Sequence, residues 1–486
     1  MTENTIIKAK PQKVWEYFTQ ISEIPRGSGQ EEKISDYLVR FAEENGLACK
    51  QDEYLNVWIK REASSNKKNH PGVILQGHMD MVWEKNSDVD FDFDNQPIAL
   101  VQEGDFIRAK GTTLGADNGI GMAFILALLT EDENDLPQIE GVITSDEERG
   151  LAGALHFDGS LLEGRYFINI DSEDDKEILT SCAGGIRINH RLHFRREKLK
   201  DSKFRQATIA VTGLKGGHSG MDIDKNRANA NVVAARTLQR IFNEMEGMLI
   251  DFTGGAKDNA IPREAKITFA YDGTEKENLE RIVKDMEHAV RKEYLTGEEN
   301  IRFTLSHQGT VVGPVIPREE SEAVVEAILV LPNGIQKRQS ARVGDIISSV
   351  NIGVVQTEED RAAIDCAARS SLLSAKEEIM EKNRILSKRL NTKMEFTGEY
   401  PGWAYEPESP LREKAVEIYR NLFSRDPEIV GVHAGVECGI FKEKKTDLDM
   451  ISVGPNIIDV HSPDEKLSIS STQKMYRFMV ELLKEL

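Results

Sequence analysis

Five side chains of the kinds that bind divalent metals are spread along this chain, each beside an apolar segment that is typical of a buried strand or helix. They are His78, Asp117, Glu148, Asp171 and His461. Residues so far apart meet only if the apolar segments pack together and their ends lie at one edge of a sheet, where loops carry binding sites. The pattern therefore favours an α/β fold that assembles a two-metal hydrolytic site.

His78 and Asp80 follow the apolar residues 73–75, which we expect to form a buried strand. Residues two apart on a strand face the same side. Asp80 is thus placed to accept a hydrogen bond from one ring N–H of His78, which leaves the other ring nitrogen for a metal. A solvated His–Asp pair at a strand end is the alternative for this motif alone.

Carboxylates gather in the next two motifs. In GTTLGADNGIG a glycine-rich turn places Asp117 just before an apolar helix, where the helix dipole favours a negative charge. In GVITSDEERG a predicted strand leads into Asp146, Glu147 and Glu148, which repel one another unless cations lie nearby. One glutamate can bind a metal while its neighbour moves protons. A charged surface turn is the alternative interpretation.

Charge counting supports a pair of metals. Two divalent ions bring four positive charges; Asp117, Glu148 and Asp171 offset three of them, and a bridging hydroxide offsets the fourth. Nitrogen and oxygen ligands without cysteine suit zinc, with manganese and cobalt as alternatives. We therefore expect two divalent metal ions per subunit.

The motifs HMD, GADNGIG, SDEERG, the aspartate after FINI and the histidine of DVHSPDE resemble, in this order, those of the di-zinc aminoacylase, carboxypeptidase and carnosinase superfamily. GTTLGADNGIG, KGGHSG and HAGVECGIF are more closely similar to the aminoacyl-histidine dipeptidases, also called cytosolic non-specific dipeptidases. The resemblance covers essentially the whole chain. It implies that Asp117 bridges the metals, that His78 and Asp171 complete one site, and that Glu148 and His461 complete the other.

The same resemblance implies that Glu147 is the general base and that Asp80 orients His78. The activity it predicts is hydrolysis of dipeptides with a free amino terminus, of broad specificity and including the Xaa-His type, with carnosine as a candidate. In this mechanism Glu147 activates a metal-bridging hydroxide. The tetrahedral oxyanion is then stabilised in a site from which water is largely excluded.

The length of 486 residues allows two domains. Helical patterns at 11–21 and 31–44 are followed by alternating strands and helices as far as Asp171, and alternating strands begin near residue 186. Because His461 must return to His78, we expect a lid domain of α+β type, residues 186–399, to be inserted into the catalytic di-metal peptidase domain. That domain then comprises residues 1–185 and 400–486, with a central mixed sheet flanked by helices.

The resemblance also implies residues that bind the substrate. His218, in KGGHSGMD, would polarise the scissile carbonyl, and Asn259 would contact the substrate. Arg369 would hold the terminal carboxylate through its planar guanidinium, with Arg342 and Arg263 as competing candidates. Without the resemblance, His218 would be interpreted as a surface histidine in a turn.

The motif HAGVECGIF contributes Glu437, which we expect to pair with the free amino group of a dipeptide. A carboxylate that caps the loop is the alternative explanation. His433 is expected to be structural, because the five ligands already account for both metals.

A net charge of −20 argues against a nucleic-acid partner and against an anionic membrane surface. The first residues lack an apolar signal core, and the four cysteines form no C-x-x-C pair, so we expect a cytoplasmic protein with reduced thiols. A small peptide is the expected partner. A homodimer in which His218 serves its own site or its neighbour's is compatible with the sequence.

Two other functions remain open at this stage. An amide deacylase would use the same metals on N-acyl amino acids, although Glu437 favours a free amino group. A non-catalytic metal-bound scaffold protein would be expected to lack the base or some ligands, and this chain keeps them all.

Overall fold

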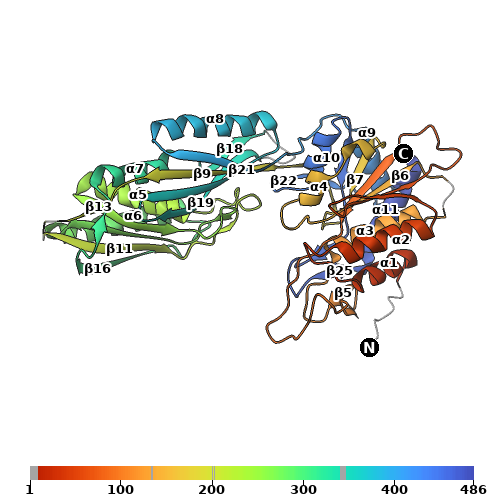
Figure 1. The fold of residues 1–486 in the computed structure, drawn as a ribbon, viewed down its shortest axis with the longest axis horizontal. Helices are drawn as coiled ribbons and strands as arrows, with labels where there is room; N and C mark the ends of the chain where they lie inside the picture. The colour runs from red at the N-terminus through yellow and green to blue at the C-terminus, as the bar shows by residue number, and fades with distance from the viewer. Residues whose placement is uncertain (1–8, 133–134, 200, 202, 340–345) are drawn as a thin grey trace. The chain divides into compact units, whose positions relative to one another are not determined.

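The chain folds into two compact units (Figure 1). The computed structural model describes residues 9–132, 135–199, 201, 203–339 and 346–486. The first unit comprises Met1–Ser181, Trp403–Gly431 and Val436–Leu486, and the second comprises Cys182–Gly402 and Val432–Gly435. The expected boundaries were 185/186 and 399/400. The structure differs by placing Val432–Gly435, from the predicted catalytic domain, with the second unit.

A mixed sheet forms the centre of the first unit and has eight strands within the described residues. In order across the sheet they are β1 (Ala48–Gln51), β2 (Val57–Arg61), β6 (Ile139–Thr144), β3 (Val73–His78), β7 (Tyr166–Asn169), β23 (Asp449–Ser452), β8 (Glu177–Cys182) and β22 (Glu428–Val432). β3 runs parallel to β6 and β7, and β7 runs parallel to β23. Every residue of β3 and β6 is buried, as central strands covered on both faces must be.

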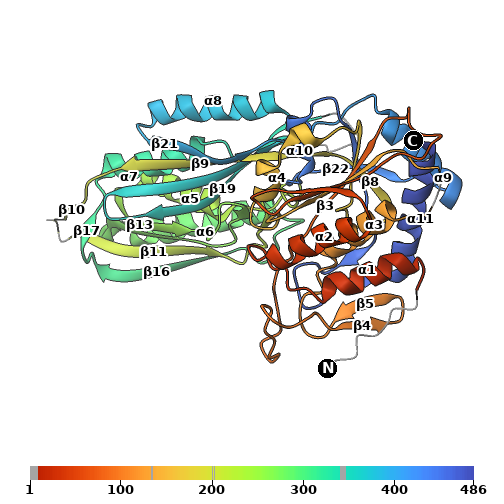
Figure 2. The same ribbon diagram turned by 45° about the vertical axis from the view of Figure 1, so that its right-hand side comes forward.

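Helices cover both faces of this sheet (Figure 2). The larger core lies under α1 (Gln12–Ser22), α2 (Glu32–Glu44), α3 (Ala116–Leu129), α9 (Pro410–Phe423) and α11 (Ile469–Glu485). Elsewhere in the unit, α10 (Cys438–Lys444) contacts both α4 (Ala152–His156) and a 3-10 turn (Gly159–Leu161). Phe167 of β7 packs on Phe441 of α10 with ring centroids 5.1 Å apart, whereas Ile168 points into the larger core. Alternate residues of one strand thus serve both layers.

A small sheet of the first unit carries the loop of a predicted ligand. Its strands are β24 (Ile457–Ile458), β25 (Lys466–Ser468), β5 (Phe106–Ala109) and β4 (Leu100–Glu103). His461 lies in the connection between β24 and β25. The predicted helices at 11–21 and 31–44 and the predicted strand at 73–75 are confirmed, as is the α/β class with a mixed, helix-flanked sheet.

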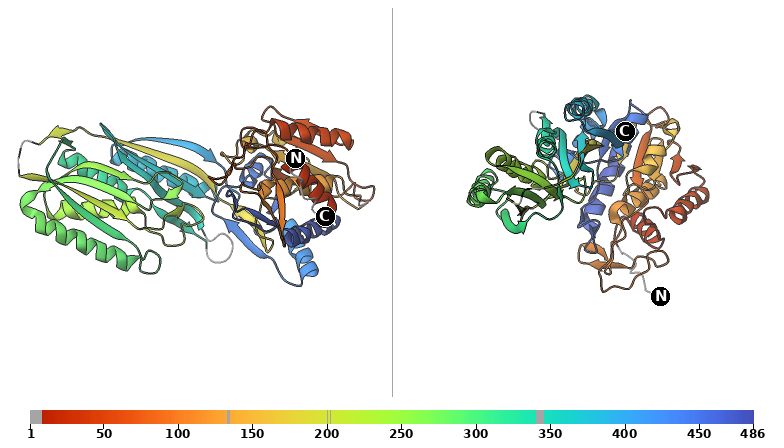
Figure 3. Two further views of the ribbon diagram at one scale, coloured as in Figure 1. Left: turned by 90° about the horizontal axis from the view of Figure 1, so that it is seen from below. Right: turned by 60° about the vertical axis from the view of Figure 1, so that its left-hand side comes forward.

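The second unit is built on an antiparallel sheet. In order its strands are β16 (Arg302–Thr310), β11 (Phe204–Thr212), β15 (Ala265–Asp272), β13 (Gly247–Gly254), β19 (Ile346–Thr357), β20 (Arg361–Ser370), β9 (Gly184–His193) and β21 (Lys393–Tyr400), with β18 (Gly334–Arg338) beside β19. Helices α5 (Ala230–Glu244), α6 (Lys276–Glu293) and α7 (Arg318–Val330) share one core with this sheet (Figure 3). α8 (Leu373–Arg389) lies along β9, β20 and β21.

Short elements complete the second unit. β12 (Gly217–His218) pairs with β14 (Ala260–Ile261), β10 (Glu197–Lys198) pairs with β17 (Pro314–Val315), and a 3-10 turn (Gly273–Glu275) precedes α6. The segment Val432–Gly435 is bound here because the Ala183 N–H donates to the carbonyl oxygens of Val432 (3.1 Å) and Ala434 (3.0 Å). The ring of His433 also lies 2.8 Å from the Ser349 hydroxyl.

Within the described ranges, every helix is too short or too polar to cross a membrane. The four cysteines all lie in the described ranges and none takes part in a disulfide; Cys182, Cys366 and Cys438 are buried.

The stability of the second unit is expected to fall as the pH drops below about 6.5, partly because of His190. This ring is buried between Asn383 and Thr392, and burial lowers its pKa below the ordinary value of 6.5. Below that value the unfolded chain binds a proton that the folded ring resists, so protonation favours unfolding. Urea unfolding at pH 7.5 and pH 5.5 should show a smaller loss of stability for His190→Gln than for the wild type. An equal loss in both proteins would contradict the prediction.

Candidate metal centre

The five predicted metal ligands lie together in the first unit, in two groups that share Asp117. One group is His78, Asp117 and Asp171, and the other is Asp117, Glu148 and His461. Within each group, one possible ligand atom per residue lies within 4.8 Å of the others. Two triads with one carboxylate in common can hold two neighbouring cations.

The two oxygen atoms of Asp117 face different groups. Oδ1 lies 3.0 Å from Nε2 of His78, which is 3.4 Å from Oδ1 of Asp171. Oδ2 lies 3.1 Å from Nε2 of His461, which is 2.9 Å from Oε1 of Glu148. A carboxylate turned in this way can serve one ion with each oxygen.

Strand direction explains why these residues meet. His78 ends β3, Glu148 follows β6 and Asp171 follows β7, and these three strands run parallel, so their carboxyl ends share one edge of the sheet. Asp117 lies in the first turn of α3 after Gly115, whose φ of 69° is in the left-handed region that glycine adopts freely.

Asp80 lies behind His78 and is fully buried. Its Oδ1 is 3.3 Å from Nδ1 of His78, the ring nitrogen that faces away from Asp117. The Asp80 carboxylate also accepts the backbone N–H groups of Glu147 (3.0 Å) and Glu148 (3.2 Å) and the Ser28 hydroxyl (2.8 Å). One carboxylate therefore orients both the histidine and the turn that carries the two glutamates.

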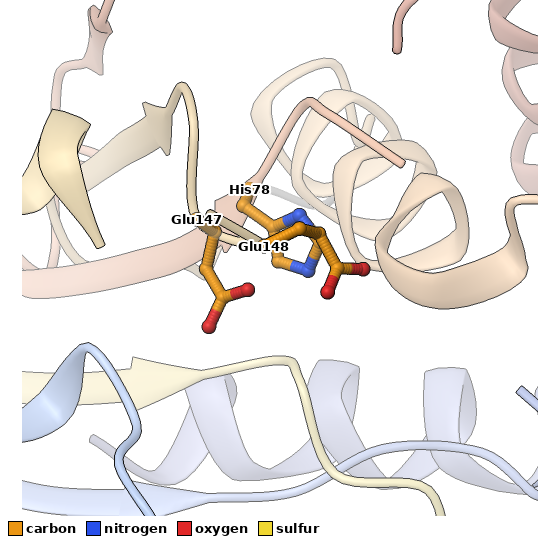
Figure 4. Close-up of side chains that lie close together, drawn as sticks. All are labelled: His78, Glu147 and Glu148. Atoms are coloured by element: carbon orange, nitrogen blue, oxygen red, sulfur yellow. The ribbon is translucent and has the colours of Figure 1, made fainter. Parts of the chain in front are cut away.

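Glu147 and Glu148 leave their turn with carboxylates pointing apart, close to the His78 ring (Figure 4). A carboxylate oxygen of each lies within 4.8 Å of a nitrogen of that ring. Burial is the main reason that the pKa of Glu147 is raised well above its ordinary value, and the charge of Asp171 adds to it. A carboxylate that holds a proton readily is suited to proton transfer.

The charges of the site fit divalent cations. Burial, with the neighbouring charges of Asp117 and Glu148, raises the pKa of Asp171 to about 6. Hydrogen bonds from His461 and His78 outweigh the effect of burial and hold the pKa of Asp117 below its ordinary value. Buried carboxylates in such numbers require compensating positive charge. The donors are nitrogen and oxygen without cysteine, a set that suits zinc, manganese or cobalt.

Glu437 is completely buried beside this centre. Its Oε2 accepts hydrogen bonds from Nε2 of Gln76 (2.5 Å) and the Thr144 hydroxyl (2.8 Å), whereas the buried Oε1 has no hydrogen-bond partner among the described residues. The side chain makes no capping hydrogen bond to α10, so the geometry does not favour the loop-capping alternative. Burial raises the pKa of Glu437 to about 7.

Three predicted substrate residues gather in the second unit. The Nε2 atom of His218 lies 3.1 Å from Nη2 of Arg369, and Nη1 of Arg369 donates to the Tyr400 hydroxyl (3.1 Å). The main-chain carbonyl of Asn259 accepts the N–H of Ser219, the residue after His218 (2.9 Å). Burial and the charge of Arg369 lower the pKa of His218, which favours a neutral ring.

The competing arginines lie elsewhere. Arg263 lines a cavity of about 790 Å³ in the second unit, together with Gly216, Gly217 and Lys257. Arg342 lies outside the described residues. His433 is buried, and its ring is hydrogen-bonded to the Ser349 hydroxyl, which agrees with a structural role.

Several residues that hold the site were not predicted from the sequence. Arg26 and Glu465 contact the turn of Asp117, Gln76 and Thr144 hold Glu437, and Tyr400 contacts Arg369. Position in the sequence gives a weak signal only for Glu465, four residues after His461.

Comparison with known proteins identifies the family. The model of Peptidase family M20/M25/M40 matches residues 74–485. The chain belongs to this peptidase family. It is 36% identical over 476 residues to the cytosol non-specific dipeptidase of Escherichia coli (strain K12), an alignment that covers 98% of both proteins. The predicted resemblance and the prediction of a peptidase are confirmed.

Solved structures agree with this assignment. The crystal structure of aminoacylhistidine dipeptidase from Vibrio alginolyticus matches with a TM-score of 0.93 and 35% identity, covering 100% of this chain and 98% of that one. The aminopeptidase PepT from Bacillus cereus matches with a TM-score of 0.57 and 16% identity over 98% of this chain and 99% of that one, which shows the shared fold alone.

Substitutions in the two triads should remove metal ions selectively. His461→Ala and Asp171→Asn each remove a ligand from one triad and are expected to leave about one metal ion per chain after dialysis. Asp117→Asn changes the ligand that both triads share and should leave almost none. Atomic emission measures the content. The control is Asp158→Asn, a carboxylate of the first unit whose side chain is 51% exposed. Retention of two ions by Asp117→Asn would contradict the shared-ligand geometry.

Proposed function

We propose that this chain is a metallo-dipeptidase that hydrolyses dipeptides with a free amino terminus, with broad specificity that includes Xaa-His substrates such as carnosine. The observation that carries the proposal is the pair of triads that share Asp117, with Glu147 beside them. The 36% identity to a cytosol non-specific dipeptidase over 98% of both chains supports the substrate class. We also propose a cytosolic location, which the name of that relative supports.

We assign His78 and Asp171 to one metal, Glu148 and His461 to the other, and Asp117 to both. Zinc is the proposed metal, because two of the five ligands are imidazoles, and manganese and cobalt are the alternatives. When bound, two such ions lower the pKa of a water molecule and polarise the scissile carbonyl.

Glu147 is the proposed general base. Its carboxylate takes a proton from the attacking water and passes it to the nitrogen of the leaving amine. Burial supports this role, because the raised pKa of Glu147 allows the carboxylate to hold the proton between the two transfers. Asp80 supports it from behind by fixing the backbone N–H of Glu147 at 3.0 Å.

We assign the substrate's ammonium group to Glu437. The unpaired Oε1 supports this assignment, because a buried carboxylate oxygen without a donor is costly until a cation binds it. Gln76 and Thr144 occupy the other oxygen and fix the direction of the carboxylate. On the second unit we assign His218 to the carbonyl oxygen and Arg369 to the substrate carboxylate. Asn259 is assigned a contact with the substrate, as the resemblance implies.

Replacement of Glu147 by Ala should separate proton transfer from metal binding. The variant is expected to keep near-normal metal content and to lose about 10²- to 10⁴-fold in kcat, the range for a general base. Metal analysis and steady-state kinetics on Ala-His provide the test. Glu163→Gln, an exposed glutamate of the same unit, is the matched control and should keep its activity. If Glu147→Ala kept most of its turnover, the role would have to be reassigned.

The free amino group distinguishes a dipeptidase from a deacylase. Chelator-stripped protein, with zinc, manganese or cobalt restored, is expected to cleave Ala-His and β-Ala-His but not N-acetyl-Ala-His. Glu437→Gln should raise KM for Ala-His, because it removes the negative charge that the ammonium group meets. Cleavage of the acetylated substrate alone would favour the amide deacylase. Cleavage of none of the three substrates would favour the non-catalytic metal-bound scaffold protein.

A further inference from the structure

Glu465 binds the turn that carries Asp117 through four consecutive backbone N–H groups. Oε2 accepts the N–H of Leu114 (2.7 Å) and of Gly115 (2.9 Å), and Oε1 accepts those of Ala116 (2.7 Å) and Asp117 (3.3 Å). The side chain is 2% exposed, so water does not compete for these bonds. The first N–H groups of a helix lack intrahelical partners, and an anion is favoured there. Glu465 supplies both the acceptors and the charge for the start of α3.

Arg26 holds the same turn through a backbone carbonyl. Its guanidinium donates to the carbonyl oxygen of Gly115, and also to the carbonyls of Met79 (2.9 Å) and Asp80 (3.1 Å), directly after His78. The residue at 115 is therefore bound at its N–H by Glu465 and at its C=O by Arg26. A Cβ atom at this position would lie 2.6 Å from the guanidinium, so the close approach requires glycine.

Asn118 provides a third attachment. Its side-chain N–H donates to the carbonyl oxygen of Ile170 (2.6 Å), the residue before Asp171. The turn of Asp117 is thus tied to the segments that carry His461, His78 and Asp171. Glu465 supplies the link to His461, which lies four residues earlier in the same loop.

We propose that Glu465 is a positioning residue of the metal centre. It fixes the direction of the Asp117 carboxylate and joins the Asp117 turn to the His461 loop, so that Asp117 and His461 are held in place before a cation binds. Preorganised ligands bind more tightly because less conformational freedom is lost on binding. The inference rests on the proposed function only in taking Asp117 and His461 as metal ligands.

The test is metal affinity in Glu465→Gln. Glutamine has the same size, but its NH₂ group replaces one oxygen and faces two backbone donors that then lack an acceptor. Titration of the metal-free full-length protein with zinc against a competing chelator should show about 10- to 100-fold weaker binding, the usual effect of losing a residue that orients ligands. The rise in Tm on adding zinc should shrink accordingly.

The neighbouring residue supplies the control. Asp464→Asn removes the same charge one position away, from a side chain that is 78% exposed and pairs with Arg108. Its zinc affinity should equal that of the wild type. Glu465→Asp keeps the charge with a shorter side chain; it is expected to bind zinc with intermediate affinity and serves as the test variant if Glu465→Gln does not fold.

A merely structural role gives a different result. If Glu465→Gln lowered the Tm of the metal-free protein but bound zinc as tightly as the wild type, the proposal would be overturned. Weaker zinc binding in Asp464→Asn to the same degree would also overturn it, because charge alone would then be responsible. Zinc affinity is measured without a peptide substrate, so failure of the proposed dipeptidase activity would be recognised separately.

Discussion

Mutual repulsion among buried carboxylates at one sheet edge is the constraint around which the first unit is arranged. These carboxylates fall into two groups that differ in the groups around them. Asp80 and Glu465 are surrounded by N–H and O–H donors, which satisfy their charge within the protein. Asp117, Glu148 and Asp171 instead face one another and two imidazoles. Asp80 and Glu465 hold the backbone in place. The other three carboxylates keep negative charge that bound cations can neutralise.

Parallel strand direction brings the ligands to one edge of the sheet, but it does not determine the orientation of their side chains. That orientation depends on other side chains that form hydrogen bonds between the loops. Asn118 reaches the segment before Asp171, and its side chain fills space that a Cβ atom at Gly77 or Gly121 would need. The glycines of this region are therefore explained by packing around Arg26 and Asn118. A site built from such loops is held in shape by a few buried polar contacts.

The sequence predicted the parts of the fold that depend on local pattern. Apolar residues at 73–75 and 142–143 predicted strands, and the chemistry of His78 and Glu148 indicated where cations would be needed. Glu465 could not be recognised in this way, because SPDE is also typical of an exposed turn and its donors lie about 350 residues earlier. The free oxygen of Glu437 likewise depends on Gln76 and Thr144, which no periodic signal connects to it.

The placement of Val432–Gly435 limits how far the second unit is a separable module. The chain enters that unit twice, first at Cys182 and again at Val432. Excision of 182–402 would remove Ala183 and Ser349, and with them these hydrogen bonds of Val432 and His433, shortly before the helix that begins after Glu437. A minimal version of the first unit would therefore need a redesigned connection between Gly431 and Val436, and transplanting the second unit onto another scaffold would require two chain segments.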